Sequence, residues 1–384
     1  MVLKPVEARS HQAPSQLERH HLHRDEKFRN NRPALRWNNS IFQRNRGKSR
    51  RNVFIYYFCS AYSLNKKIMD NILVIGSSGQ IGSELVMALR KIYGNDHVYA
   101  TDIKQPTLEI RNSGPFQILD VLDFKNLLHF LVRYKITQIY NLAAVLSGNA
   151  EKIPLQAWDI NMKALMNTLE AARQSDARKI FWPSSIAVFG PTTPRHNTPQ
   201  LTVMEPNTVY GISKLAGERW GEYYHNRYGV DFRSVRYPGL ISYKTEPGGG
   251  TTDYAVEIFF DAIEKNSYQC FLKEDTALPM MFMDDAITNT IRLMQADGNK
   301  LSLRSAYNMA GISFDPKELA KAIQKHLPDF SISYKPDFRQ AIADSWPASI
   351  DDSVAQKDWG LKTEYGLDEM TRVMLEKIRE KLSK

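Results

Sequence analysis

Three side chains in the middle of the chain have the types and spacing that proton transfer requires. Tyr210 and Lys214 stand four positions apart in VYGISKLAGE (209–218), a segment whose composition predicts a helix, so one helix face carries both. A tyrosine titrates near pH ~10 and is a poor base at neutral pH; lowering its pKa by about 3 units takes roughly 4 kcal/mol of anion stabilisation. We expect the Lys214 ammonium to stabilise the phenolate, so that Tyr210 becomes a usable general base.

Ser185 is the third candidate. It ends KIFWPSS (179–185), a segment that predicts a buried strand. In a parallel sheet covered by helices, ligands bind beyond the carboxyl ends of the strands, where this hydroxyl could hold a substrate oxygen near the tyrosine. A Tyr-x-x-x-Lys spacing also arises by chance in ordinary helices, so the catalytic interpretation depends on the elements around it.

The first of these elements is NILVIGSSGQIGSELVMALRKIYG (71–94). Its short apolar run predicts a buried parallel strand, and the stretch that ends at Gly94 predicts an amphipathic helix. Gly76, Gly79 and Gly82 lie between the two. Glycines at this place let the backbone approach a pyrophosphate at the helix N-terminus, so we predict a dinucleotide site.

Asp102 ends the next predicted strand, HVYATD, 20 residues after Gly82. A carboxylate here accepts hydrogen bonds from the ribose hydroxyls of adenosine and repels the extra phosphate of NADP. The sequence therefore predicts NAD as the cofactor, although Lys104 lies nearby and would favour a phosphate.

The alternation of strands and helices continues along the chain and predicts an α/β fold with a doubly wound parallel sheet. Asp120 stands near the end of one predicted strand, and NLAA (141–144) forms a turn of small residues after another, where close approach of a cofactor is expected. The further predicted strands are 116–123, 136–144, 179–185 and 230–241, and the predicted helices between them are 124–134 and 155–174.

The composition of the 384-residue chain, 42% hydrophobic and 24% charged, is that of a globular protein. No apolar run reaches the roughly 18 residues of a transmembrane helix, so we predict no membrane span. Two cysteines, Cys59 and Cys270, are too few for a disulfide framework and form no cluster with histidine, so we predict no metal site.

The net charge of +9 belongs to the N-terminal segment. Residues 1–68 hold 15 Lys and Arg against four acids, a net charge of +11, whereas the remaining 316 residues hold 36 basic and 38 acidic side chains. A basic arm can bind polyanions, but the nearly neutral body gives no reason to predict nucleic-acid binding.

The role of this N-terminal segment stays open at this point. Residues 1–52 show no periodicity and predict disorder, and a short apolar run, VFIYYFCSAYSL (53–64), follows. The segment could be a mitochondrial presequence, a signal peptide or a real functional arm, or the product could begin at Met69 with the upstream residues a translation-start artefact. We accordingly predict a cytoplasmic protein, or one of the mitochondrial matrix if the presequence is genuine.

Taken together, these motifs resemble the extended short-chain dehydrogenase/reductase family, over residues 70 to about 380. The resemblance implies Ser185, Tyr210 and Lys214 as the catalytic set, a Rossmann domain over 69–240, and a small substrate-binding and lid domain formed mainly by 241–384. It also implies a homodimer built from helices near 155–174 and 211–228. The cofactor contacts that it implies are Gly76, Gly79, Gln80, Ile81, Gly82, Asp102, Asp120, Val121, Leu142, Ala143, Ala144, Asn161, Tyr210, Lys214, Tyr237 and Pro238.

Within this family, RYPGLISYKTEPGGGTTDYAVEIFFDAI (236–263) resembles the short-chain type of L-threonine 3-dehydrogenases, as do AAVLSG (143–148), LPMMFMDDAI (278–287) and SWPASIDDS (345–353). The PGGGTTDYA loop is small, neutral and rich in hydroxyls, which suits the carboxylate of a compact zwitterion held by N–H groups, hydroxyls and a Thr-capped helix start. A flexible surface loop is the other interpretation. The substrate contacts implied are Ser147, Ser185, Tyr210, Gly250, Thr251 and Thr252, with Trp346 either a further contact or a core residue.

The resemblance implies oxidation of L-threonine at C3 to 2-amino-3-oxobutanoate, with NAD⁺ reduced to NADH. One alternative is a nucleotide-sugar epimerase or dehydratase of the same family, which would keep the three catalytic residues and retain its NAD. A non-catalytic NAD-sensing protein and a polyanion-binding protein that uses the basic arm are the others.

Overall fold

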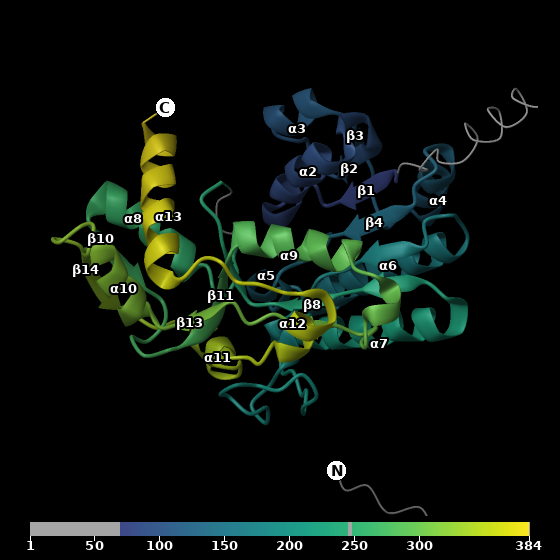
Figure 1. The fold of residues 1–384 in the computed structure, drawn as a ribbon. Helices are drawn as coiled ribbons and strands as arrows, with labels where there is room; N and C mark the ends of the chain where they lie inside the picture. The colour runs from purple at the N-terminus through teal and green to yellow at the C-terminus, as the bar shows by residue number, and fades with distance from the viewer. Residues whose placement is uncertain (1–69, 245–247, 384) are drawn as a thin grey trace, which may run out of the picture. The chain divides into compact units, whose positions relative to one another are not determined.

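A computed structural model describes residues 70–244 and 248–383, which belong to one compact unit spanning 67–384 (Figure 1). The interpretations of residues 1–68 therefore lie outside the described part of the chain and stay predictions. No helix in the described ranges combines the length and the apolar character that a membrane crossing needs.

The centre of the molecule is a six-stranded parallel sheet, which confirms the predicted α/β class and the doubly wound arrangement. Its strands, in spatial order, are β3 (Phe116–Ile118), β2 (Val98–Asp102), β1 (Ile72–Ile75), β4 (Gln138–Asn141), β5 (Lys179–Phe181) and β7 (Asp231–Arg233). The helices that connect them are α2 (Gln80–Tyr93), α3 (Leu108–Ser113), α4 (Phe124–Arg133), α5 (Ser147–Ala150), α6 (Pro154–Arg173) and α7 (Val209–Tyr228).

Both faces of this sheet are buried, which explains its continuous apolar strands. In β1, Ile72 and Val74 pack with α2, α9 (Met283–Gln295) and α12 (Ser353–Trp359) on one face. Leu73 and Ile75 pack with α4, α6 and α7 on the other. Because side chains alternate along a strand, a four-residue run of apolar residues supplies both cores.

The predicted strand over 230–241 is wrong as one element. It divides into β7, β8 (Val235–Tyr237) and β9 (Gly239–Ile241), and these pair in three different sheets. Pro238 lacks an N–H group and lies at the second break, where the chain leaves one sheet for another. In the smaller sheets, β8 lies between β6 (Ser184–Ser185) and β12 (Tyr307–Asn308), and β11 (Leu278–Phe282) lies between β9 and β13 (Ile312–Phe314).

The C-terminal elements build a further core, which gathers at the left of Figure 1 around α8 and α13. Its buried side chains come from helices, from a two-stranded parallel ribbon, from the sheet of β9, β11 and β13 and from the segment 186–189. The boundary that we predict near residue 240 stays a prediction. The elements here are α8 (Tyr254–Lys265), β10 (Ser267–Cys270), α10 (Pro316–Gln324), β14 (Ser331–Tyr334), α11 (Arg339–Asp344) and α13 (Leu367–Leu382); short 3-10 turns are η1 (Asn95–His97), η2 (Ile186–Val188) and η3 (Gly298–Lys300).

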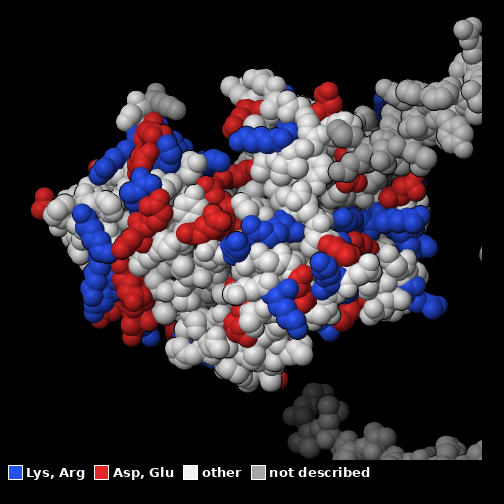
Figure 2. All heavy atoms as spheres, in the orientation of Figure 1, with Lys and Arg blue, Asp and Glu red and all other residues white. Residues whose placement is uncertain are grey.

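Charged side chains of both signs are interspersed over the face shown in Figure 2. Along α13, for example, Arg372 pairs with Glu369 and Glu376, and Lys377 pairs with Glu380. Such exposed pairs contribute little to stability. They keep this face close to neutral, as the composition of the body predicts.

Candidate active site

The glycine turn joins β1 to α2 in the way the sequence predicts. Gly76 has a φ of +81°, a left-handed conformation that favours glycine. A Cβ atom on Gly82 would lie 2.1 Å from the Gly76 carbonyl oxygen, so position 82 tolerates no side chain without movement of the backbone. The turn is therefore compact, and the N-terminus of the 14-residue helix α2 begins directly behind it at Gln80, with Ile81 in its first turn.

Asp102 lies at the end of β2 against this turn. Its carboxylate accepts hydrogen bonds from the backbone N–H of Ser78 and of Lys104, each at 2.9 Å. The hydroxyls of Ser77 and Ser78 are buried and have no hydrogen-bond partner among the described residues. A helix N-terminus with orphaned hydroxyls beside it and an acid across from it fits a dinucleotide phosphate and an adenosine ribose.

A pocket of about 400 Å³ opens beside the turn and brings half of the predicted cofactor residues together. Its walls come from the ends of β1, β2 and β4 and from the segment after β3, as expected at the carboxyl edge of a parallel sheet. The predicted residues that line it are Gly76, Gly79, Asp102, Asp120, Val121, Leu142, Ala143 and Ala144.

Asn161 supports this pocket from behind. Its side-chain oxygen accepts a hydrogen bond from the Val145 N–H at 2.7 Å, and its amide donates to the Val145 carbonyl at 3.2 Å and to Ser213 Oγ at 3.4 Å. The amide is thus used to hold the loop after β4. This geometry suits a residue that positions the pocket wall better than one that contacts a cofactor.

Ser185 and Tyr210 meet at the sheet edge. The Ser185 hydroxyl lies close enough to the Tyr210 phenol to lower its pKa. Ser185 ends β6, which pairs with β8, and Tyr210 lies in the first turn of α7, whose N-terminus is capped by the Thr208 side chain accepting from the Gly211 N–H at 3.1 Å. The predicted pair is therefore within reach of one substrate oxygen.

Lys214 is buried one turn further along α7. Its ammonium donates a hydrogen bond to the Pro183 carbonyl at 2.6 Å, and Nζ lies 4.2 Å from the centroid of the Trp182 ring and 5.4 Å from that of Tyr210. Burial lowers the pKa of Lys214 to about 7, and the Glu218 carboxylate partly opposes this effect.

The protein by itself does not lower the pKa of Tyr210, so the expected contribution of Lys214 stays a prediction for the protein with oxidised cofactor bound. Burial raises the pKa of Tyr210 to about 12, and the contribution that lowers it comes from the Ser185 hydrogen bond. Burial away from water disfavours the phenolate more strongly than the Lys214 ammonium favours it, since the lysine is itself easily deprotonated. Ionisation near neutral pH therefore needs further positive charge beside the phenol.

The predicted substrate loop packs against α5, which carries Ser147. A Cβ atom on Gly148 would lie 2.4 Å from the Gly249 carbonyl oxygen, and the Asn149 amide donates to the Gly248 carbonyl at 3.3 Å. The structure thus brings together two segments that lie about a hundred residues apart in the sequence. The close approach explains why α5 needs a glycine after its serine.

Two details of this loop differ from the prediction. The N–H groups of Gly249 and Gly250 both donate to Asp253 Oδ2, at 2.8 and 2.6 Å, so they are not available to a substrate carboxylate. Asp253, not a threonine, stands at the N-cap of α8, with helical backbone angles and no side-chain cap. The buried Thr251 hydroxyl has no partner among the described residues and remains a candidate donor next to Thr252.

Three further predicted contacts do not line the pocket beside the glycine turn. The Tyr237 side chain is buried in the core that packs against α9, and its hydroxyl hydrogen-bonds Thr290, because alternation along β8 turns it inward. That Tyr237 lines the nicotinamide site stays a prediction. Pro238, which follows, is buried at the break in the strand. Trp346 is buried in the C-terminal core, which favours its structural interpretation.

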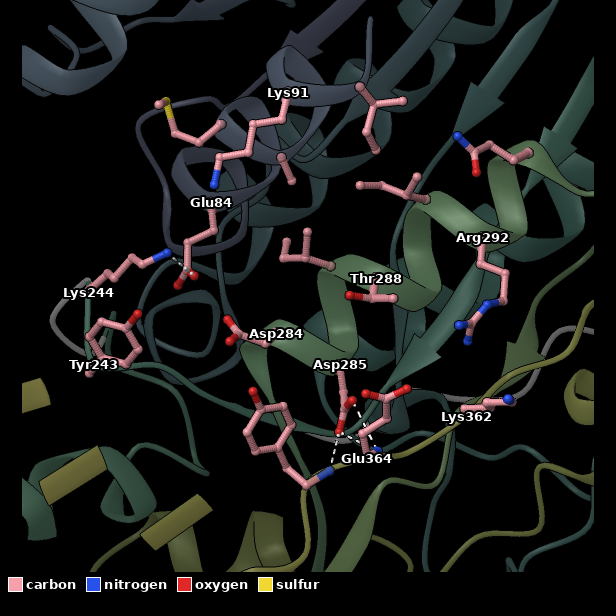
Figure 3. Close-up of a pocket in the computed structure, with 17 residues that line it drawn as sticks. Glu84, Lys91, Tyr243, Lys244, Asp284, Asp285, Thr288, Arg292, Lys362 and Glu364 are labelled. Atoms are coloured by element: carbon pink, nitrogen blue, oxygen red, sulfur yellow. Dashed lines mark hydrogen bonds and ion pairs between the residues drawn. The ribbon is translucent and has the colours of Figure 1, made fainter. Parts of the chain in front are cut away.

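A second pocket, of about 750 Å³, lies between α2, α9 and residues 362–365 (Figure 3). Glu84 pairs there with Lys244 at 3.0 Å, and Asp285 accepts from the backbone N–H groups of Glu364 and Tyr365 at 3.1 Å. No predicted site residue lines this larger pocket. The chemistry therefore points to the smaller pocket beside the glycine turn.

Sequence reasoning missed three residues that shape the site. Trp182 and the Pro183 carbonyl hold Lys214, and Asp253 shapes the substrate loop. Trp182 and Pro183 stand directly before the two serines, a signal that was visible in the sequence. No signal in the sequence pointed to Asp253, because its partners are backbone N–H groups.

Comparison with known proteins agrees with this geometry. The model of the NAD dependent epimerase/dehydratase family matches residues 72–310. A curated relative from Staphylococcus haemolyticus, described as an uncharacterized epimerase/dehydratase, is 50% identical over 315 residues, which make up 82% of this chain and 99% of the relative.

Solved structures with high similarity carry a more specific description. A GalE-like L-threonine dehydrogenase from Cupriavidus necator, in its holo form, is 56% identical with a TM-score of 0.78 and covers 80% of this chain and 99% of its own. The L-threonine dehydrogenase from Clostridium difficile is 47% identical with a TM-score of 0.79 and covers 82% of this chain and 98% of its own.

Proposed function

Because the chain belongs to the NAD dependent epimerase/dehydratase family, we propose that it is an NAD-dependent L-threonine 3-dehydrogenase. The observation that carries the proposal is the Ser185 hydroxyl beside the Tyr210 phenol, with Lys214 on the same face of α7. The small, hydroxyl-rich loop around Thr251 favours a compact zwitterion over a nucleotide sugar, whose diphosphate calls for basic side chains. The solved L-threonine dehydrogenases support the same substrate.

The chain's own residues divide the work of oxidation. Ser185 and Tyr210 hold the C3 hydroxyl of L-threonine between them. Tyr210 takes the hydroxyl proton while C3 loses its hydride, so that the C3–O bond becomes the ketone of 2-amino-3-oxobutanoate. Bound NAD⁺ supplies the hydride acceptor and, as a pyridinium, a positive charge beside the phenol. Lys214 adds to this charge and holds the nicotinamide ribose.

The pocket beside the glycine turn would hold the cofactor. The Ser77 and Ser78 hydroxyls and the start of α2 face a phosphate, and Asp102 retains acceptor capacity for the ribose hydroxyls. Two backbone N–H groups hold the Asp102 carboxylate at the end of β2, where its charge opposes the extra phosphate of NADP. NAD is therefore the cofactor that these residues suit.

Substrate contacts follow from the loop geometry. The Thr251 and Thr252 hydroxyls and Ser147 are the donors we assign to the carboxylate of threonine, since Asp253 occupies the glycine N–H groups. The segments after residue 240 carry this loop, and we propose that their closure over the sheet edge excludes water and aligns the reacting atoms.

The test is a substrate panel with the purified full chain and NAD⁺. We expect NADH formation with L-threonine and much less with L-serine and L-allo-threonine. The alternative, a nucleotide-sugar epimerase or dehydratase, would interconvert UDP- or GDP-sugars with copurifying NAD and no net NADH. Absence of threonine-dependent NADH in a folded, NAD-binding protein would overturn the proposal.

A homodimer is part of this proposal. Large apolar side chains are exposed on the helices expected to form the interface: Leu155 is 81% exposed on α6, and Ile212 and Tyr223 are 46% and 49% exposed on α7. The two helices also pack against one another. Burying such a face is favourable, and a second copy of the chain would cover it.

A further inference from the structure

A third side chain shares the helix face of Tyr210 and Lys214. Glu218 lies one turn beyond Lys214 on α7 and is fully buried. Its carboxylate accepts a hydrogen bond from Ser184 Oγ at 2.6 Å and forms a bidentate pair with Arg236, at 2.9 and 2.8 Å. A buried carboxylate is costly unless it is paired and fully hydrogen-bonded, and here both conditions are met.

These partners join the elements that carry the catalytic set. Ser184 is the neighbour of Ser185 in β6, and it stands opposite Arg236 in the pairing of β6 with β8. Arg236 also donates to the Gln200 carbonyl at 3.1 Å and to Asn308 Oδ1 at 3.0 Å. Glu218 therefore fastens the helix that bears the base to the strand that bears the serine, and through Arg236 to two further segments.

The same carboxylate acts on Lys214 through its charge. The groups that face the Lys214 ammonium are the Tyr210 ring and Glu218 on α7, the Pro183 carbonyl and the Trp182 ring; Arg236 of β8 stands behind Glu218. Among these, Glu218 carries the negative charge that raises the pKa of Lys214. An apolar side chain at 218 would fill the space but would neither hold Ser184 nor favour the ammonium.

We infer that Glu218 is a positioning residue for the reaction: with Arg236 it fixes Ser184, and thereby Ser185, against the α7 face that carries Tyr210 and Lys214. This inference rests on the proposed function. The competing explanation is that the Glu218–Arg236 pair is purely structural. Replacing a buried ion pair by apolar residues is often neutral for stability, so stability alone does not decide between the two. The two explanations differ in what they predict for kcat in a folded variant.

The main test is Glu218→Gln in the full chain, with kcat and KM for L-threonine expressed per folded cofactor site, counted by NADH fluorescence titration. We expect kcat to fall by about 10- to 100-fold, since sub-ångström displacement of reacting groups has effects of this size, while KM changes less than about threefold. The matched control is Asp231→Asn, which breaks a partly buried pair with Arg233 in β7 and should lower the melting temperature with kcat within about twofold.

Two further variants cover a failure of Glu218→Gln to fold. Ser184→Ala removes one hydrogen bond and leaves the ion pair, and should lower kcat by about 3- to 10-fold. The pair variant Glu218→Met with Arg236→Met should fold with a lowered melting temperature, because Ser184, Gln200 and Asn308 lose buried partners, and should have a low kcat per folded site. Wild-type kcat per site in Glu218→Gln, or in the pair variant, would overturn the inference. Lack of threonine oxidation by the wild type would overturn the proposed function instead.

Discussion

Lys214 Nζ lies 4.2 Å from the centroid of the Trp182 ring. Its hydrogen-bond acceptor is the Pro183 carbonyl, so its direct partners are an aromatic face and a peptide group, not a carboxylate. An ammonium in such a place gives up its proton readily, and burial lowers its pKa to about 7. Burial of this lysine therefore lowers the free energy of unfolding, and it places a positive charge beside Tyr210.

This cost has a defined pH window. The folded-state pKa of about 7 lies below the roughly 10.4 of an unfolded lysine, so the unfolded chain binds more protons between these values and stability rises with pH across them. Lys214→Met removes the effect. We expect the difference in melting temperature, Lys214→Met minus wild type, to be about 2–5 °C more positive at pH 6 than at pH 10. Scanning calorimetry at both pH values measures this; Lys125→Met, exposed on α4, is the control. Equal differences at both pH values would contradict the account.

The raised pKa of Tyr210 gives a second pH prediction. The phenolate form of Tyr210 is the base. Because its pKa is about 12 in the protein by itself, the phenolate population rises about tenfold for each unit by which the pH increases towards that value. Bound NAD⁺ adds positive charge beside the phenol, so we expect kcat/KM for L-threonine at saturating NAD⁺ to rise with pH from pH 6 and to level off below pH 12. A kcat/KM that stays constant from pH 6 to pH 9 would contradict Tyr210 as the titrating base.

Asp253 provides a test of the substrate loop. Asp253→Asn weakens the two bonds that hold the Gly249 and Gly250 N–H groups, so the loop should lose the shape that presents Thr251. We expect KM for L-threonine to rise about tenfold with kcat within about threefold, because the reacting groups stay in place. Asp261→Asn, which loses only a pair with Lys265 on the same helix, is the matched control. An unchanged KM would show that the shape of this loop does not affect the binding of L-threonine.

The proposed dimer is open to a direct measurement. Placing charges on the apolar face of α6 and α7, as in Leu155→Glu combined with Tyr223→Lys, should prevent association, because burying unpaired charge is costly. We expect light scattering to give twice the chain mass for the wild type and a single chain mass for the variant. Wild-type protein that stays monomeric at all concentrations would remove the dimer from the proposal.

Local sequence patterns predict those parts of the site whose structure depends on residues that lie close together in the chain. The strand, glycine turn and helix over 71–94 and the shared face of Tyr210 and Lys214 follow from patterns within a few turns of chain, and the structure reproduces them. Asp102 also lies where the spacing predicts.

Contacts between distant segments could not be predicted in the same way. The division of 230–241 depends on which strands are available to pair with β8 and β9. The capture of the Gly249 and Gly250 N–H groups by Asp253 depends on how the loop is folded against α5. The pKa of Tyr210 in the protein by itself depends on burial, which no local pattern reveals.

The central claim is that Tyr210 is the base in the NAD-dependent oxidation of L-threonine. The most direct measurement compares NADH formation from L-threonine by the wild type and by Tyr210→Phe, each shown to be folded and to bind NADH. The account predicts wild-type activity and a fall in kcat of about 10³-fold or more in the variant, with NADH affinity changed only a few-fold. A Tyr210→Phe enzyme that retains kcat within about tenfold would contradict the role of the tyrosine.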